Sequence, residues 1–153
     1  LAPTSNHRTP TMASRNMTNF AKLAASPGAI VDPGDYGGIS RHDYDEIVTD
    51  GTETTGERLY CGKLMPGERF HEAVVVFGAL GAARTLQLGD AGDDDRYMAA
   101  TSVAAAGNAE ARAATGFGYK NTTLVPIDLF LQIAGGALTA AQSIKIAIRK
   151  SRD

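Results

Sequence analysis

The sequence has no tryptophan and a single cysteine, Cys61. One cysteine cannot build an intramolecular disulfide framework, which fits a reducing compartment or indifference to redox conditions. No apolar run approaches the roughly 20 residues that a membrane-spanning helix needs, so we expect no membrane partner. Lys and Arg number 15 against 17 Asp and Glu, and this near balance gives no sign of a direct nucleic-acid partner.

Residue patterns that carry catalysis or metal binding are also missing. The histidines His7, His42 and His71 lack metal-ligand spacing, and His71-Glu72 lacks the second histidine of a zinc-protease helix. Cys61 has no paired base in the sequence pattern and is expected to be a small buried hydrophobe. No nucleophile elbow occurs. We therefore expect no catalytic residue, no metal site and no cofactor, and we do not expect an enzyme.

Four aspartates, Asp90, Asp93, Asp94 and Asp95, form an acidic loop whose role stays open. Ca²⁺ takes roughly six to eight oxygen ligands from a bent loop. The spacing here does not match a calcium loop, and no bidentate Glu follows. A solvated turn is the preferred interpretation. Ion binding and contact with basic groups of a partner are the alternatives.

Alternating and β-branched apolar residues predict a chain made of strands. The organising stretch is Glu68 to Asp90, in which residues 70–77 and 84–90 flank a Gly-containing break and predict an antiparallel hairpin. A hairpin alone is not stable in water, so further strands must cover its apolar face. Those strands are expected at residues 39–48, 58–65, 96–107, 110–119, 124–133 and 142–150. Eight short strands predict an all-β antiparallel sandwich, with a jelly roll preferred.

The last of these strands has the cleanest alternation. Ile144, Ile146 and Ile148 are expected to face the core. The side chains expected on or near the exposed side are those of Ser143, Lys145, Ala147, Arg149, Lys150 and Arg152. Their cations form a basic patch that is either a solvated edge, which deters edge-to-edge aggregation, or a docking surface for an acidic protein partner.

Residues 1–28 are expected to form an extended N-terminal arm, and residues 29–153 the β-sandwich domain. The arm is polar, contains Pro3, Pro10 and Pro27, and has no Asp or Glu. Such a segment cannot offset its own ordering entropy in isolation, so it is either a loose terminus or an arm that orders on a partner. In the second case its candidate contact residues are Arg8, Arg15, Phe20 and Lys22.

Several pieces of the chain resemble a known family in their order. Leu59-Tyr60-Cys61-Gly62-Lys63-Leu64 runs into Pro66-Gly67-Glu68-Arg69, Leu86-Gln87-Leu88-Gly89-Asp90 runs into Asp95-Arg96-Tyr97-Met98-Ala99-Ala100, and Gly116-Phe117-Gly118-Tyr119 precedes the strand at Ile127. Over roughly residues 57–150 the chain is similar to the small cement or decoration proteins on the head exterior of tailed bacteriophages. The motifs are turns and strands, so the resemblance transfers no catalytic residue.

The resemblance implies a virion structural protein on the capsid exterior. It implies binding across the joints between subunits of the major capsid protein, and assembly in the cytoplasm of the host bacterium. It also implies self-association, for which we expect a homodimer in preference to a trimer. The contacts are then expected from the arm and the last strand, through Arg8, Arg15, Phe20, Lys22, Lys145 and Arg149.

Other functional classes stay open. A carbohydrate- or receptor-binding module would use the same fold, although the missing tryptophan and the lack of an aromatic cluster in the loops weaken it. A small hydrolase would need a nucleophile or metal site that the sequence does not display. A tail or neck structural protein is a variant of the capsid interpretation that the sequence does not separate from it.

Overall fold

The computed structural model describes residues 14–16 and 40–152. These residues form nine β-strands: β1 (Ser14–Asn16), β2 (Ser40–Val48), β3 (Arg58–Leu64), β4 (Glu68–Phe77), β5 (Thr85–Asp90), β6 (Asp93–Ser102), β7 (Gly107–Ala111), β8 (Ile127–Ala134) and β9 (Ser143–Arg152). Within the same residues, no helix has the length and apolarity needed to span a membrane.

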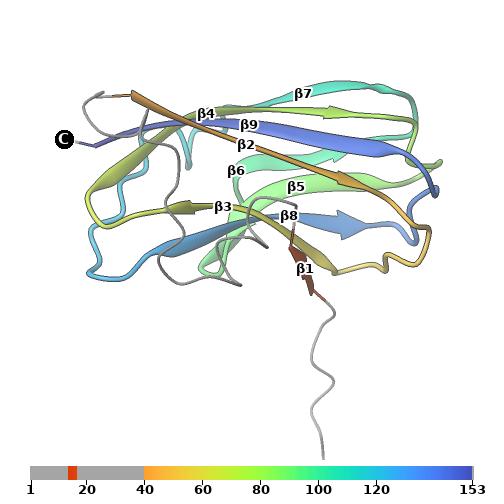
Figure 1. The fold of residues 1–153 in the computed structure, drawn as a ribbon, viewed down its shortest axis with the longest axis horizontal. Coiled ribbons are helices and arrows are strands. Elements are labelled where there is room, and N and C mark those ends of the chain that lie inside the picture. Colours follow the sequence, from red (N-terminus) through yellow and green to blue (C-terminus); the bar gives the residue numbers. More distant parts are fainter. Residues whose placement is uncertain (1–13, 17–39, 153) are drawn as a thin grey trace, which may run out of the picture.

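The strands form two sheets that pack face to face (Figure 1). One sheet has the order β2-β9-β4-β7, and the other has the order β1-β3-β8-β5-β6. All pairs from β2 onward are antiparallel, whereas β1 pairs in parallel with β3 at the edge of its sheet. The fold is therefore the predicted all-β sandwich.

The strand pairing is nested. β2 pairs with β9, β3 with β8, β4 with β7, and β5 with β6. Each strand of β2–β5 is thus antiparallel to one strand of β6–β9, taken in reverse order. Contacts of β4 with β9 and of β5 with β8 then join these pairs into two sheets. Eight strands wound in this way form a jelly roll, as the strand count suggested.

The predicted hairpin between residues 68 and 90 is wrong. β4 and β5 lie in opposite sheets, and residues 78–84 cross between them. Leu80 in this crossing is fully buried, and its amide donates to the carbonyl of Val103 at 2.9 Å. The crossing is therefore held in the core, because burying Leu80 is worth about 1.5–3 kcal/mol.

The hairpin next along the chain joins β5 and β6 at Asp90 and Asp93. The acidic residues expected in a loop thus lie at the end of β5 and at the start of β6, on either side of a tight turn that we call the acidic turn. Gly89 faces this turn: a Cβ at this position would lie 2.1 Å from the backbone carbon of Asp94. Only glycine fits such a close approach without a shift of the backbone.

The strand expected at residues 110–119 is also displaced. β7 ends at Ala111, and Gly107, which was expected to end a strand, begins β7 instead. Turns follow, in which the amides of Gly116 and Phe117 both donate to the carbonyl of Ala113. The strand expected from residue 124 begins at Ile127, directly after Pro126, as the rigid φ of proline and its missing N–H favour.

The core fills the space between the sheets. The inward side chains of β3, β4, β5, β8 and β9 supply most of it, and β9 has the predicted alternation with Ile144, Ile146 and Ile148 fully buried. Apolar burial of this kind is the main favourable term in folding. Lys150 departs from the prediction because it faces inward and is buried.

Candidate functional surfaces

The outer face of β2, β9 and β4 carries the first candidate surface. Alternation points Tyr44, Val48, Val74, Val76 and Lys145 outward, and the apolar members of this group are exposed. A shallow depression of about 160 Å³ lies among them, lined by Tyr44, Val74, Val76, Lys145, Ile146 and Ala147. We call this surface the outer sheet face.

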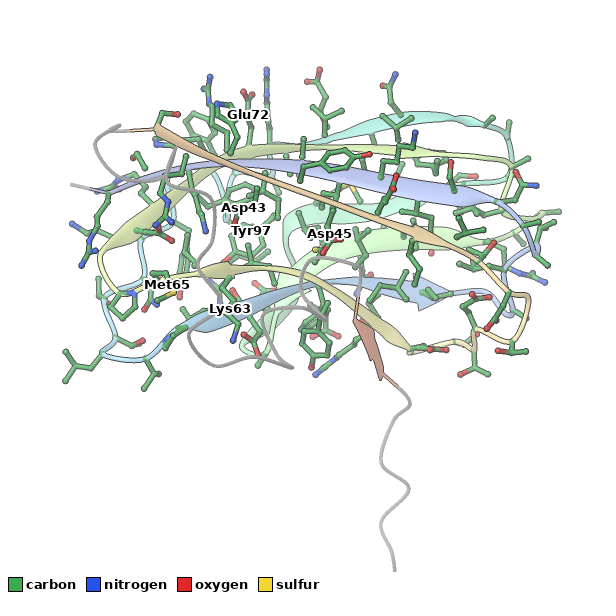
Figure 2. All side chains as sticks on the ribbon, viewed as in Figure 1. Asp43, Asp45, Lys63, Met65, Glu72 and Tyr97 are labelled. Carbon is green, nitrogen blue, oxygen red and sulfur yellow. The ribbon has the colours of Figure 1, made fainter. Side chains whose placement is uncertain are left out.

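Charges on the outer sheet face alternate in sign. Glu46 of β2 lies opposite Lys145 of β9, which lies opposite Val76 of β4. Two rows further along, beyond Ala147, Arg149 forms an ion pair with Glu72, with Nε 3.3 Å from Oε1. Figure 2 shows Glu72 on the side of the four-stranded sheet that points away from the core. The face is thus an apolar surface with balanced charge.

The structure describes three of the six contact residues that were predicted from the sequence. Lys145 and Arg149 lie together on the outer sheet face, as predicted from the alternation of β9. The backbone of Arg15 lies in β1, opposite Leu59 of β3. Arg8, Phe20 and Lys22 lie outside the described residues.

A second hollow, of about 340 Å³, lies near the β5–β6 turn. It is lined by Tyr60, Asp90, Ala91, Gly92, Arg96, Tyr119, Pro126, Ile127, Asp128 and Phe130. Two of its rings are already covered by cations. The guanidinium carbon of Arg58 lies 4.4 Å from the Phe130 ring centroid, and that of Arg96 lies 4.2 Å from the centroid of Tyr119. Cation–π contacts therefore occupy faces that a sugar ring would otherwise stack on.

The first residue of the acidic turn is a structural group and is not solvated. Asp90 is buried, and its Oδ2 accepts hydrogen bonds from Arg96 Nε at 2.8 Å and from the Tyr97 hydroxyl at 2.7 Å. Its Oδ1 accepts from the amides of Gly92 and Asp93. Burial raises the pKa of the Tyr97 hydroxyl, and the hydrogen bond to the Asp90 carboxylate raises it further.

A buried charge network joins the sheets at the end that carries the β3–β4 turn. Lys150 Nζ lies 2.6 Å from Asp43 Oδ2 and 3.3 Å from Glu68 Oε2, and it donates to the carbonyl of Lys63 at 2.6 Å. Arg41 pairs with the other oxygen of Glu68 at 2.8 Å. These partners keep Lys150 inside the sandwich, because a buried charge is tolerated only when it is paired and hydrogen-bonded.

The remaining chemistry-bearing residues have structural surroundings. Cys61 is buried, as expected, with Sγ 3.6 Å from the carbonyl oxygen of Leu129, and burial raises the pKa of its thiol. His71 Nε2 lies 2.7 Å from the Ser151 hydroxyl. Among the described residues, no group of three or more His, Cys, Asp or Glu side chains is placed to hold a metal ion.

Two solved structures resemble this fold. A chain in the capsid of Ralstonia phage GP4 matches with a TM-score of 0.66 and 19% identity, covering 81% of this chain and 91% of that chain. A chain in the capsid asymmetric unit of cyanophage Pam1 matches with a TM-score of 0.64 and 28% identity, covering 84% and 96%. No protein-family model and no curated protein matches the sequence.

The aligned fraction of each chain indicates the length of the two similar proteins. About four fifths of this chain covers more than nine tenths of each of them, so each is a chain of similar length with the same fold throughout. Both come from phage capsids, and the matches support a virion structural role.

Proposed function

We propose that the chain is a capsid cement or decoration protein. It binds the outer surface of a phage shell built from the major capsid protein and strengthens the joints between subunits. The single observation that carries this proposal is the nearly end-to-end likeness to a short chain in the cyanophage Pam1 capsid, at 28% identity. Its role is mechanical, without a catalytic step, and it acts on virions assembled in the cytoplasm of the host bacterium.

The physical basis of this role is preferential binding to one state. A protein that binds the assembled lattice and not the separated subunits stabilises the lattice by mass action. Repetition over symmetric sites adds avidity, because a protein held at one site is concentrated near the next. Modest contacts at each site are therefore sufficient.

Two surfaces are proposed for these contacts. The first is the arm, residues 1–28, with Arg8, Arg15, Phe20 and Lys22. The pairing of β1 with β3 supports it, since this pairing places the backbone of residues 14–16 against the edge of the sandwich. The second is the outer sheet face, with Lys145 and Arg149. Its balanced charge also suits contact with a second copy, because an isologous dimer needs a self-complementary patch.

Deletion of residues 1–28 tests the proposal. The truncated chain should keep the far-ultraviolet circular dichroism and cooperative melting of the full chain, because the core described here lies within residues 40–152. It should lose cosedimentation with purified shells, since an arm that orders on the shell supplies contact area. Shell occupancy equal to that of the full chain would contradict the role of the arm. Failure of the full chain to bind any shell would contradict the function itself.

A carbohydrate-binding module is the second candidate. Such a module would use the hollow that contains Tyr60, because aromatic side chains often line ligand pockets. Arg58 and Arg96 already cover one face each of Phe130 and Tyr119, which leaves Tyr60 as the ring for stacking. Glycan binding in an array, together with no binding to empty shells, would select this function. Binding to necks or tails in place of shells would select the tail or neck variant.

A further inference from the structure

The exposed large apolar side chains in the described part of the chain fall into two groups. One group lies on the outer sheet face. The other comprises Met65 in the β3–β4 turn, and Phe117, Leu124 and Val125 in the β7–β8 connection. Leu124 is 95% exposed and Val125 is 63% exposed. Single exposed apolar residues are ordinary, but neighbours held together in one place mark an interaction site.

The Leu124–Val125 pair is rigidly presented. The side chain of Asn121, which is fully buried, donates through Nδ2 to the carbonyls of Leu64 and Val125, both at 2.8 Å. Its Oδ1 accepts from the amide of Thr123 at 2.9 Å and from its hydroxyl at 2.7 Å. The loop is thus fixed at its base and near its tip. A preorganised side chain loses little conformational freedom when it binds.

The same hydrogen bonds bring Met65 close. Because one nitrogen atom bonds both carbonyls, residues 64 and 125 lie within a few ångströms of each other. Met65 follows directly, and Figure 2 shows it at the end of the sandwich that carries the β3–β4 turn. We call Met65, Leu124 and Val125 the apolar tip.

Cations lie on the segments next to the apolar tip. Arg69 pairs with Lys120 across a β-bridge, and Glu68 lies opposite Arg152 in the β4–β9 register. A Cβ built on Gly67, in the turn beside Met65, would lie 3.8 Å from Nε of Arg152. An apolar centre with a basic rim calls for a partner with an apolar pocket and an acidic rim, because complementary rims suppress wrong partners and speed association.

We propose that the apolar tip inserts into an acidic-rimmed apolar pocket on a subunit of the capsid shell. This inference rests on the proposed function and adds a third contact to the arm and the outer sheet face. A second copy of this chain is a poorer partner, because Lys145 lines the apolar depression on its outer sheet face and would oppose the basic rim.

The test compares Leu124→Ser/Val125→Ser with the matched variant Val48→Ser. Val48 is 65% exposed, close to the 63% of Val125, so its replacement removes an exposed valine from the outer sheet face. Cosedimentation with purified shells gives the affinity, and circular dichroism with thermal melting checks the fold of each full-length variant. We expect Leu124→Ser/Val125→Ser to bind at least about tenfold more weakly, as expected for loss of a buried anchor. Leu124→Met, which keeps an apolar side chain, should bind nearly as tightly as the wild type.

Charge reversal tests the rim. Lys120→Glu/Arg152→Glu should weaken binding most at low salt, and binding equal to that of the wild type at low salt would contradict an acidic rim on the partner.

The outcomes separate the two proposals. A wild type that fails to bind any shell overturns the proposed function. A wild type that binds, with Leu124→Ser/Val125→Ser binding equally well, overturns the inference alone. Weaker binding by Val48→Ser with unchanged binding by Leu124→Ser/Val125→Ser assigns the contact to the outer sheet face and overturns the inference. Loss of a sedimenting oligomer, with shell binding intact, assigns the apolar tip to a second copy and overturns it too.

Discussion

At the scale of single residues, Tyr97 links the core to the acidic turn. Its side chain is fully buried, and its ring centroid lies 4.4 Å from that of Phe70 and 6.0 Å from that of Tyr119. Its hydroxyl donates to Asp90 at 2.7 Å. A buried hydroxyl bonded to a carboxylate resists deprotonation, because ionisation would place two negative charges together in a desolvated site.

Stability should therefore fall in alkali. Burial and the Asp90 carboxylate raise the pKa of Tyr97 above its ordinary value of 10.0, so the folded state keeps a proton that the unfolded chain releases. The stabilisation is complete below pH 10 and is lost as the pH rises above it, by about 1.4 kcal/mol per pH unit. Urea unfolding between pH 9.5 and about 11.5 measures this slope. Tyr97→Phe should reduce the dependence of the unfolding free energy on pH. Cys61→Ala measures how much of that dependence comes from the buried thiol. An unchanged slope in Tyr97→Phe would contradict this origin.

At the scale of elements, the sequence was informative where the pattern is local. The alternation in β9 predicts which isoleucines enter the core. The strand predicted from residue 124 is present but begins three residues later, after Pro126. The sequence does not identify the strands that pair with β4. The apolar runs of β4 and β5 have the same pattern whether the two strands form a hairpin or lie in opposite sheets. Only the docking of Leu80 beside Val103, far away in sequence, separates the two.

The same limit applies to the candidate surfaces. Alternation finds Lys145 and Arg149, because both point outward from a regular strand. Lys150 was predicted to be exposed, because its ion-pair partners Asp43 and Glu68 lie in strands far away in the sequence. Leu124 and Val125 read as the start of a strand. The local signal for their exposure was Asn121 followed two residues later by Thr123, a pattern typical of an Asx-turn. Such a turn places Leu124 and Val125 in the loop before β8.

The buried charge network gives a prediction about how the sheets are joined. Lys150→Met should lower the free energy of unfolding by about 3 kcal/mol, because it removes the buried cation shared by Asp43 and Glu68 and the hydrogen bond to the carbonyl of Lys63 in the opposite sheet. Lys145→Met, on the same strand but exposed, should change it by no more than about 0.5 kcal/mol. Urea denaturation compares the two. Equal stability of the variants would mean that the network does not contribute to the folded state.

At the scale of the whole molecule, the formal net charge is only −2, while the cations Arg69, Lys120 and Arg152 gather around one end. A nearly neutral protein has little long-range attraction for any partner, so its local charges act mainly at contact distance. The paired sheets and nested strands hold these surfaces in fixed relation. A rigid sandwich of this kind suits a repeated lattice, because each copy can bind its site in the same orientation.

The last prediction concerns the shell. If the chain binds only the assembled lattice, the temperature at which purified shells break should rise with protein concentration. The gain should be about 2.7 kcal/mol per occupied site at a free concentration of 100 times Kd. Light scattering during heating of shells titrated with the full chain measures the shift. Bovine serum albumin at equal concentration controls for crowding, which is worth less than about 1 kcal/mol. Separated shell subunits should bind weakly, since they lack the joints and the avidity of the lattice. Equal affinity for separated subunits and intact shells would remove the differential binding on which stabilisation depends.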